Sequence, residues 1–188
     1  MRFSVDAHAI GRHLTGNEVY VRNLLNSFAA LDQQSEFIAY LSHNVNGAAA
    51  VVPERIARSV VSANSFLRLG LDLSRRVRRD RPDLLHVQYT APLACPVPIV
   101  VSVHDISFLE HPEYFPWARM AQLRLTVRRT IERAVKVITP SEFSRQAIAD
   151  LKALGVTPVM LTGDNAATAQ GIAAQAGIDD ARGDLLPE

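Results

Sequence analysis

Apolar and polar positions follow two periods along this chain, and together they predict an α/β protein. Short runs rich in Val, Ile and Leu are typical of buried parallel strands, whereas longer runs repeat apolar residues every three or four positions, as amphipathic helices do. The predicted strands cover residues 2–9, 36–41, 58–61, 84–88, 99–104, 135–138 and 156–161. The predicted helices cover residues 17–31, 65–79, 117–134 and 166–176, with another beginning at residue 141. This alternation predicts a Rossmann-like, doubly wound, mostly parallel sheet.

Particular residues set the expected helix boundaries. Asn17 is predicted to cap the first helix, and Pro82 is predicted to stop the helix that ends at residue 79. Ser141 is predicted to cap a later helix, and Gly177 to end the last one. No stretch rich in Pro, Gly or Ser interrupts the chain near residue 150. We therefore expect the residues after 150 to dock on the same sheet as a strand–helix unit.

Composition places the chain among ordinary globular proteins. It has 188 residues, of which 48% are hydrophobic, and a formal net charge of +1. So small a charge gives no general attraction to nucleic acid, and we expect no nucleic-acid partner. The single cysteine, Cys95, excludes an internal disulfide. There is no signal-peptide pattern and no apolar run near the roughly 20 residues that span a bilayer, so we expect a cytoplasmic protein without a transmembrane segment.

Basic residues nevertheless gather in two places, residues 75–81 and residues 124–133. The first interpretation is that each is the solvated face of a helix. The second is that one of them attracts an anionic membrane surface or a phosphorylated substrate. Both interpretations stay open, and the second leaves room for a weak peripheral contact with a membrane.

Two loops that follow predicted strands carry candidate binding residues. Parallel sheets bind ligands at the carboxyl ends of their strands. The first loop contains Gly11, Gly16 and Asn17, where glycine lets the backbone approach a phosphate and the following helix N-terminus favours an anion. In the second, His104 and Asp105 directly follow a buried strand, and an imidazole there can donate a hydrogen bond or exchange a proton. The alternatives are a tight turn and a histidine bonded to the backbone.

A third loop, residues 138–145, contains Ser141, which either caps its helix or faces the same edge. Around these loops, residues 15–25, 104–115 and 134–145 resemble the N-terminal, acceptor-binding domain of the family-four glycosyltransferases of the GT-B fold. The resemblance covers about residues 1–150, which we take as the first domain.

The resemblance implies a retaining transfer of a sugar from a nucleotide-sugar substrate to a glycan or lipid acceptor, with no other cofactor and no metal. It implies that Gly11 and Gly16 approach the donor diphosphate, that His104 lies beside the transferring sugar, and that Asn17, Asp105 and Ser141 belong to the same binding region. The family's C-terminal domain, with its paired-glutamate motif, is absent from the sequence. Because transfer needs groups on both sides of the cleft, we expect little or no hexosyltransferase activity from this chain alone.

A second signature follows. Thr162, Gly163 and Asp164 come directly after a predicted strand, where a hydroxyl and a carboxylate suit a phosphoryl group or equally form a simple turn. Residues 147–188 resemble part of the phosphorylation domain of heavy-metal P-type ATPases, of the haloacid-dehalogenase-like fold, which implies that Thr162 contacts phosphate. The phosphorylated-aspartate segment of that family is absent, and phosphoryl transfer needs nucleophile, metal and cationic clamp together.

Three hypotheses therefore remain for the chain, with domains at residues 1–150 and 151–188. It is the acceptor half of a glycosyltransferase, or a structural chimera without catalysis, or an ATPase phosphorylation-domain fragment with an unrelated N-terminal extension. The first signature is the longer one and gives the leading hypothesis for ancestry, whereas for activity we favour the structural chimera.

Overall fold

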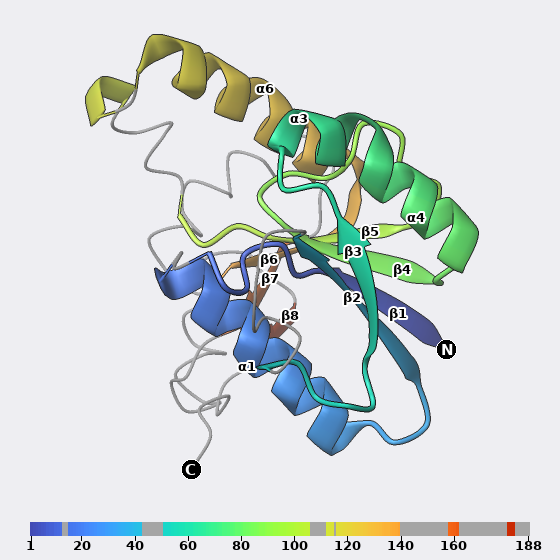
Figure 1. Ribbon diagram of the computed structural model, residues 1–188. Coiled ribbons are helices and arrows are strands. Elements are labelled where there is room, and N and C mark those ends of the chain that lie inside the picture. The colour runs from blue at the N-terminus through green and yellow to red at the C-terminus, as the bar shows by residue number, and fades with distance from the viewer. Residues whose placement is uncertain are drawn as a thin grey trace. The chain divides into compact units, whose positions relative to one another are not determined.

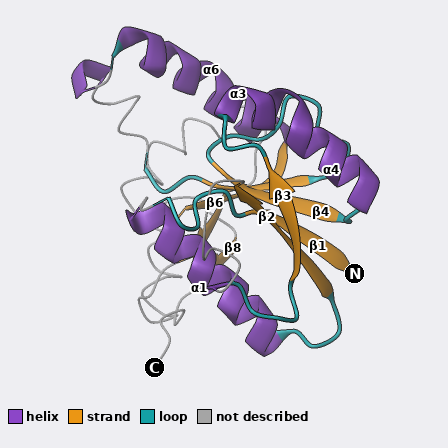
Figure 2. Cartoon of the chain, in the orientation of Figure 1, coloured by secondary structure: helices purple, strands orange, loops and turns teal. Residues whose placement is uncertain are grey.

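The computed structural model describes residues 1–12, 15–42, 51–105, 112–114, 116–139, 158–161 and 180–182 (Figure 1). Two compact units are present. The first consists of Met1–Val87 with Ala91–Ile99, and the second of Gln88–Thr90 with Val100–Glu188. Strands and helices alternate along the described chain (Figure 2), so the protein is α/β and Rossmann-like, as the sequence predicts.

The first unit is built on parallel strands. They are β1 (Arg2–Asp6), β2 (Glu36–Ser42), β3 (Ala57–Val61) and β4 (Leu84–Gln88), in the order β3-β2-β1-β4. Val5 of β1 pairs with Ala39 on one side and with His86 on the other. Because the chain adds strands first on one side of β1 and then on the other, β1 is central and its carboxyl end lies where the strand order reverses.

Two helical segments cover opposite sides of these strands (Figure 1). On one side, α1 (Thr15–Leu31) buries Val21 and Leu25 fully, and its Phe28 stacks on Phe37 of β2 at 4.9 Å between ring centroids. Burying such a side chain contributes about 1.5–3 kcal/mol. The packed core beneath α1 therefore holds both ends of the loop that connects β1 to α1.

On the other side, the predicted helix over residues 65–79 is broken into three parts. They are α3 (Ser65–Leu67), a π-helical turn η1 (Arg68–Asp72) and α4 (Leu73–Asp80). Asn64 caps the start, since its side chain accepts hydrogen bonds from the N–H groups of Phe66 and Leu67. A π turn holds one residue more than an α-helical turn, and here Arg68 is buried as well as Leu73 and Val77. The helix ends before Pro82, as predicted, with Arg81 in the left-handed region at φ 49°.

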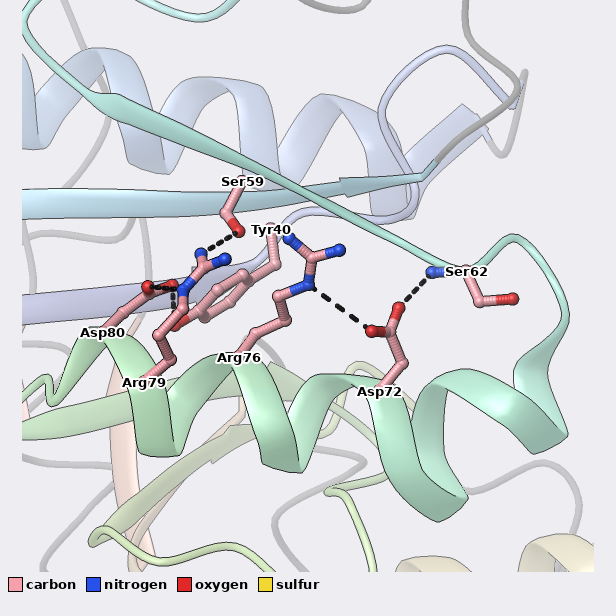
Figure 3. Close-up of polar contacts among 7 residues, drawn as sticks. All are labelled: Tyr40, Ser59, Ser62, Asp72, Arg76, Arg79 and Asp80. Carbon is pink, nitrogen blue, oxygen red and sulfur yellow. Dashed lines mark hydrogen bonds and ion pairs between the residues drawn. The ribbon is translucent and has the colours of Figure 1, made fainter.

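Polar contacts tie α4 to strands β2 and β3 (Figure 3). The Tyr40 hydroxyl donates to Asp80 Oδ2 at 3.3 Å, and Arg79 Nη2 donates to Ser59 Oγ at 3.3 Å. Asp72 accepts from the Ser62 N–H at 2.7 Å and from Arg76 Nε at 3.4 Å. Figure 3 shows Arg76 and Arg79 reaching from the helix toward the strands, so these two arginines are engaged inside the unit.

The second unit holds the remaining strands, apart from Ile99 at the start of β5. These are β5 (Ile99–Ser102), β6 (Ala134–Thr139), β7 (Pro158–Leu161) and β8 (Asp180–Arg182), in the order β5-β6-β7-β8, with helix α6 (Trp117–Arg133) and a 3-10 turn η2 (Pro112–Tyr114). Strand β7 pairs parallel with both β6 and β8. A strand from beyond residue 150 thus pairs with one from before it, and α6 buries Val127, Thr130 and Ile131.

The predicted boundaries differ from the structure at several places. Asn17 does not cap α1, because the helix already begins at Thr15 and Asn17 lies within its first turn. Strand β1 stops at Asp6 rather than residue 9, and β8 had not been predicted. The predicted helices beginning at residues 141 and 166, with Gly177, lie outside the described residues. Among the helices that are described, none is both long and apolar enough to cross a membrane.

Candidate functional site

At the carboxyl end of β1, three side chains form what we call the charged cluster: Asp6, His8 and Arg68. His8 Nδ1 lies 3.0 Å from Asp6 Oδ1, and Arg68 Nε lies 3.6 Å from Asp6 Oδ2. Asp6 is 2% exposed and Arg68 is 4% exposed. Strand β1 places the carboxylate, and the π turn η1 brings the guanidinium to it. The cluster is thus a buried ion pair with an imidazole attached at its more exposed side.

The electrostatics of this cluster keep Asp6 ionised. Burial acts to raise the pKa of the Asp6 carboxyl, but His8, through its charge and hydrogen bonds, and Arg68, through its charge, outweigh burial and lower that pKa. Arg68 Nε and Nη1 are buried without a hydrogen bond to any described residue. The ion pair therefore depends on proximity of charge rather than on a complete set of hydrogen bonds.

The glycine loop follows directly. Gly11 has φ 77°, a conformation that glycine adopts without strain, and its N–H donates to Glu18 Oε1 at 2.8 Å. A phosphate that reached this N–H would have to displace the Glu18 carboxylate. Gly16 is exposed in the first turn of α1, where an added Cβ would meet nothing within 4 Å, and Asn17 is half-buried beside it.

In the second unit, four residues at the ends of β4 and β5 form what we call the neutral cluster: Gln88, Tyr89, His104 and Asp105. His104 Nε2 lies 3.0 Å from Gln88 Oε1, so with the amide oxygen as acceptor the imidazole carries its proton on Nε2. The Tyr89 hydroxyl donates to Asp105 Oδ2 at 2.6 Å. The Tyr89 and His104 rings meet edge to face at 5.7 Å.

This network has a strained backbone and an uncharged histidine. Tyr89 has φ 57°, which a non-glycine residue adopts at a cost of about 1–3 kcal/mol, and such outliers concentrate at ligand sites. Burial lowers the pKa of His104 despite the opposing charge of Asp105. Burial and the hydrogen bond to Asp105 raise the pKa of Tyr89. Near neutral pH the cluster thus presents a neutral imidazole and a neutral phenol.

The structure divides the predicted site residues between the units. Gly11, Gly16 and Asn17 belong to the first unit, and His104 and Asp105 to the second. The other predicted site residues lie outside the described residues: Ser141, Thr162, Gly163 and Asp164.

Sequence reasoning missed five residues of the two clusters: Asp6, His8, Arg68, Gln88 and Tyr89. The signal that found His104, polar residues directly after a buried strand, also applies to the ends of β1 and β4.

A hollow of about 740 Å³ lies at the opposite, amino-terminal ends of β1, β2 and β3. Its charged groups already have partners: Arg2 contacts Glu36 at 2.7 Å, Arg79 contacts Asp80 at 2.6 Å, and Arg55 and Arg58 donate to backbone carbonyls. We therefore place the candidate site at the carboxyl ends. Within the described part of the chain, no group of three or more His, Cys, Asp and Glu side chains is arranged to hold a metal ion.

Comparison with known proteins gives two kinds of match. Residues 14–158 match Glycosyltransferase Family 4, which is more than half of the chain. A shorter part is similar to the probable copper-transporting P-type ATPase B of Staphylococcus aureus, at 49% identity over 47 residues, or 25% of this chain and 7% of that protein. The cation-transporting P-type ATPase B of Mycobacterium tuberculosis is 46% identical over 50 residues, 27% of this chain and 7% of its own length. The chain thus spans only a small part of these ATPases, and its composition is chimera-like.

Proposed function

The chain belongs to glycosyltransferase family 4, and from this premise we propose that about residues 1–150 form the acceptor-binding half of a nucleotide-sugar-dependent transferase of the GT-B fold. The observation that carries the proposal is the neutral cluster. A histidine held by Gln88 at the end of a parallel strand is placed where such sheets bind ligands. Sugars and glycans are the corresponding substrate class.

Each residue of the neutral cluster has a chemical part in this proposal. A neutral imidazole can exchange hydrogen bonds with sugar hydroxyls without attracting the charge of a diphosphate. Gln88 holds the His104 ring, and Tyr89 holds the Asp105 carboxylate. The strained backbone at Tyr89 persists only because its surroundings over-determine it, which keeps both side chains oriented before a substrate arrives.

The glycine loop has a separate part. We propose that Gly11 and Gly16 approach the donor phosphates, with Asn17 beside them, and that Ser141 belongs to the acceptor side. An anion at Gly11 would replace the Glu18 carboxylate, which now accepts that N–H. We also propose that these residues supply one wall of a two-walled cleft, so that transfer needs donor-binding groups that the 188 residues do not include.

Calorimetric titration with UDP-glucose and with GDP-mannose tests the proposal. We expect weak but measurable binding of at least one of them and no glycoside product from the purified chain. Gly16→Ala should weaken this binding at least tenfold, because the new methyl group meets nothing in the chain and can only obstruct a ligand. Gly70→Ala is the matched control, since its Cβ also meets nothing within 4 Å. Equal affinity of the two variants for the nucleotide-sugar would show that the glycine loop does not bind it. Glycoside formation at ordinary turnover would contradict the proposal that the chain supplies only one wall of the cleft.

The ATPase similarity supports a second candidate, a phosphoryl-binding segment in which Thr162, Gly163 and Asp164 contact phosphate. We propose that residues 151–188 serve mainly to extend the sheet, because β7 pairs with β6, and that the whole is a chimera without phosphoryl transfer. Incubation with labelled ATP and Mg²⁺ tests this. Label that stays covalently on the chain would favour the second candidate, whereas an unlabelled chain agrees with a structural segment.

A further inference from the structure

Gln88 places a buried amide at the end of β4, where it is 6% exposed. Its Oε1 lies 3.0 Å from His104 Nε2, whereas its own Nε2 is buried without a hydrogen bond to any residue that the structure describes. A buried N–H group without a partner costs more free energy than one hydrogen bond usually contributes. An apolar side chain of similar length would therefore serve stability at least as well as this amide.

A second unfavourable feature lies next to the first in the chain. Tyr89 has φ 57°, a left-handed conformation that strains a non-glycine residue. The side chains of both residues meet the same pair, since Gln88 contacts the His104 imidazole and the Tyr89 hydroxyl donates to Asp105. Proteins retain features that lower stability where function needs them. The reason for keeping Gln88 is therefore to be found in what it does to His104.

The contact between Gln88 and His104 determines which imidazole nitrogen carries the proton. An amide oxygen only accepts hydrogen bonds, so the nitrogen that faces it must donate. In the neutral ring the proton is then on Nε2, and Nδ1 carries none. A hydroxyl that meets Nδ1 must therefore donate to it. Without such a partner, an imidazole exchanges between its two tautomers and presents a donor as often as an acceptor.

We propose that Gln88 is a positioning residue, which fixes the tautomer of His104 so that Nδ1 presents a hydrogen-bond acceptor to a sugar hydroxyl. Gln88 acts through the imidazole ring and does not itself contact the sugar, because its amide nitrogen is buried. This inference rests on the proposed sugar-binding function and deepens it. The site then favours a ligand whose hydroxyl can donate over one that offers only an acceptor.

Two other groups of the described chain face the ring. The Tyr89 phenol meets His104 edge to face at 5.7 Å, and the Asp105 carboxylate adds a negative charge. Burial lowers the pKa of His104, and the charge of Asp105 acts against burial. The ring is therefore neutral near neutral pH, which is the state in which the choice of tautomer matters.

NMR spectra of the full chain, labelled with the heavy nitrogen isotope in histidine, test the proposal. The His104 signals are assigned by their loss in His104→Gln. At about pH 7.5, His104 should be neutral and should carry its proton on Nε2. A proton on Nδ1 would mean that the amide nitrogen faces the ring in place of the oxygen, and would overturn the proposal.

Two substitutions at Gln88 separate positioning from a structural role. Gln88→Met removes the acceptor at similar length, so both tautomers should appear while the urea midpoint of unfolding stays the same or rises. Gln88→Glu puts a carboxylate at the same nitrogen, so the proton should stay on Nε2 and the pKa of His104 should rise by about one unit or more. The control is Gln34→Glu, which adds the same charge at an exposed glutamine after α1 and should change neither property.

Three results would contradict the positioning role. One is an unchanged tautomer in Gln88→Met. Another is a His104 pKa in Gln88→Glu equal to that of the control. The third is a clear fall of the urea midpoint in Gln88→Met, which would make Gln88 structural. If Gln88→Glu does not fold, Gln88→Met decides alone.

These readouts need no sugar, so they are separable from the test of the proposed function. A tautomer that depends on Gln88, together with no sugar binding in the calorimeter, would end the proposed function and leave the positioning of His104 standing. Sugar binding with a tautomer independent of Gln88 would do the reverse. In Gln88→Met the affinity itself should fall only about twofold, because about half of the molecules would still hold the competent tautomer.

Discussion

The two polar clusters lie at equivalent places, the carboxyl ends of parallel strands, yet they are built from opposite chemistry. In the charged cluster, the buried Asp6 carboxylate is held by the Arg68 guanidinium and the His8 imidazole. The neutral cluster pairs an uncharged imidazole with an amide and a phenol with the exposed Asp105 carboxylate, and burial keeps its histidine uncharged.

We expect this difference to separate a structural part from a binding part. A buried ion pair is costly to disturb, because removing one partner leaves a charge without compensation. A neutral network can exchange its hydrogen bonds with sugar hydroxyls at little cost, since each bond contributes only about 0.5–1.5 kcal/mol net. We therefore expect the charged cluster to hold the first unit together and the neutral cluster to meet substrate.

The largest effect is expected at the charged cluster. Asp6→Asn should lower the free energy of unfolding by about 3–5 kcal/mol, because Arg68 would remain buried and unpaired. Adding Arg68→Met should recover part of that loss. Urea unfolding followed by circular dichroism measures both.

The control for this prediction is Arg128→Gln, which breaks an exposed pair and should cost less than about 1 kcal/mol. If Asp6→Asn cost no more than the control, the charged cluster would have no structural role and the comparison would fail.

A smaller effect is expected at the neutral cluster. Tyr89→Phe removes the hydroxyl that donates to Asp105 at 2.6 Å and should lower the free energy of unfolding by about 1 kcal/mol, since that carboxylate is exposed and gains water instead. The same urea titration measures it. A loss as large as that of Asp6→Asn would show that both clusters are structural.

The two clusters should also respond to pH in different ranges. The folded-state pKa of His104 is lowered from 6.5, so the unfolded chain binds a proton first and stability falls as pH drops below about 6.5. The pKa of Asp6 is lowered from 3.8, so its contribution is present above 3.8 and is lost only at more acidic pH. Thermal unfolding between pH 7.5 and pH 5 should therefore report His104, and His104→Gln should flatten that profile. An unchanged profile in the variant would assign the acid response elsewhere.

The smallest effect on stability is expected at the glycine loop. Gly16→Ala should raise the free energy of unfolding by about 0.5–1 kcal/mol, because the helix accepts a methyl group there without contact. Differential scanning calorimetry detects such a gain. A clear loss of stability would show that the loop is strained in a way the geometry does not reveal.

Much of the fold follows from local patterns in the sequence. Strands β2 and β4 begin where the β-rich runs begin, and Pro82 stops the preceding helix. His104 is a candidate because it directly follows a buried strand. These features depend on neighbours in the chain, so a single sequence carries them.

Other features depend on partners far along the chain. An arginine such as Arg68 within a helical pattern indicates an exposed position, and its burial depends on Asp6 at the end of another strand. Tyr89 in a left-handed conformation has no local signal, since Gly and Asn are the residues expected there. The π turn likewise shifts backbone hydrogen bonds without a distinctive residue pattern.

The wide turn over Arg68–Asp72 also limits how the length of this segment can vary between relatives. Each residue of an α-helix advances the chain by about 100° around the axis. A π turn takes up one residue more than an α-helical turn in about the same rotation, so loss of one codon within it would restore an ordinary helix and leave Phe66 and Leu67 near their present positions relative to α4. A deletion elsewhere in the segment would instead rotate the residues before it by about 100° relative to those after it.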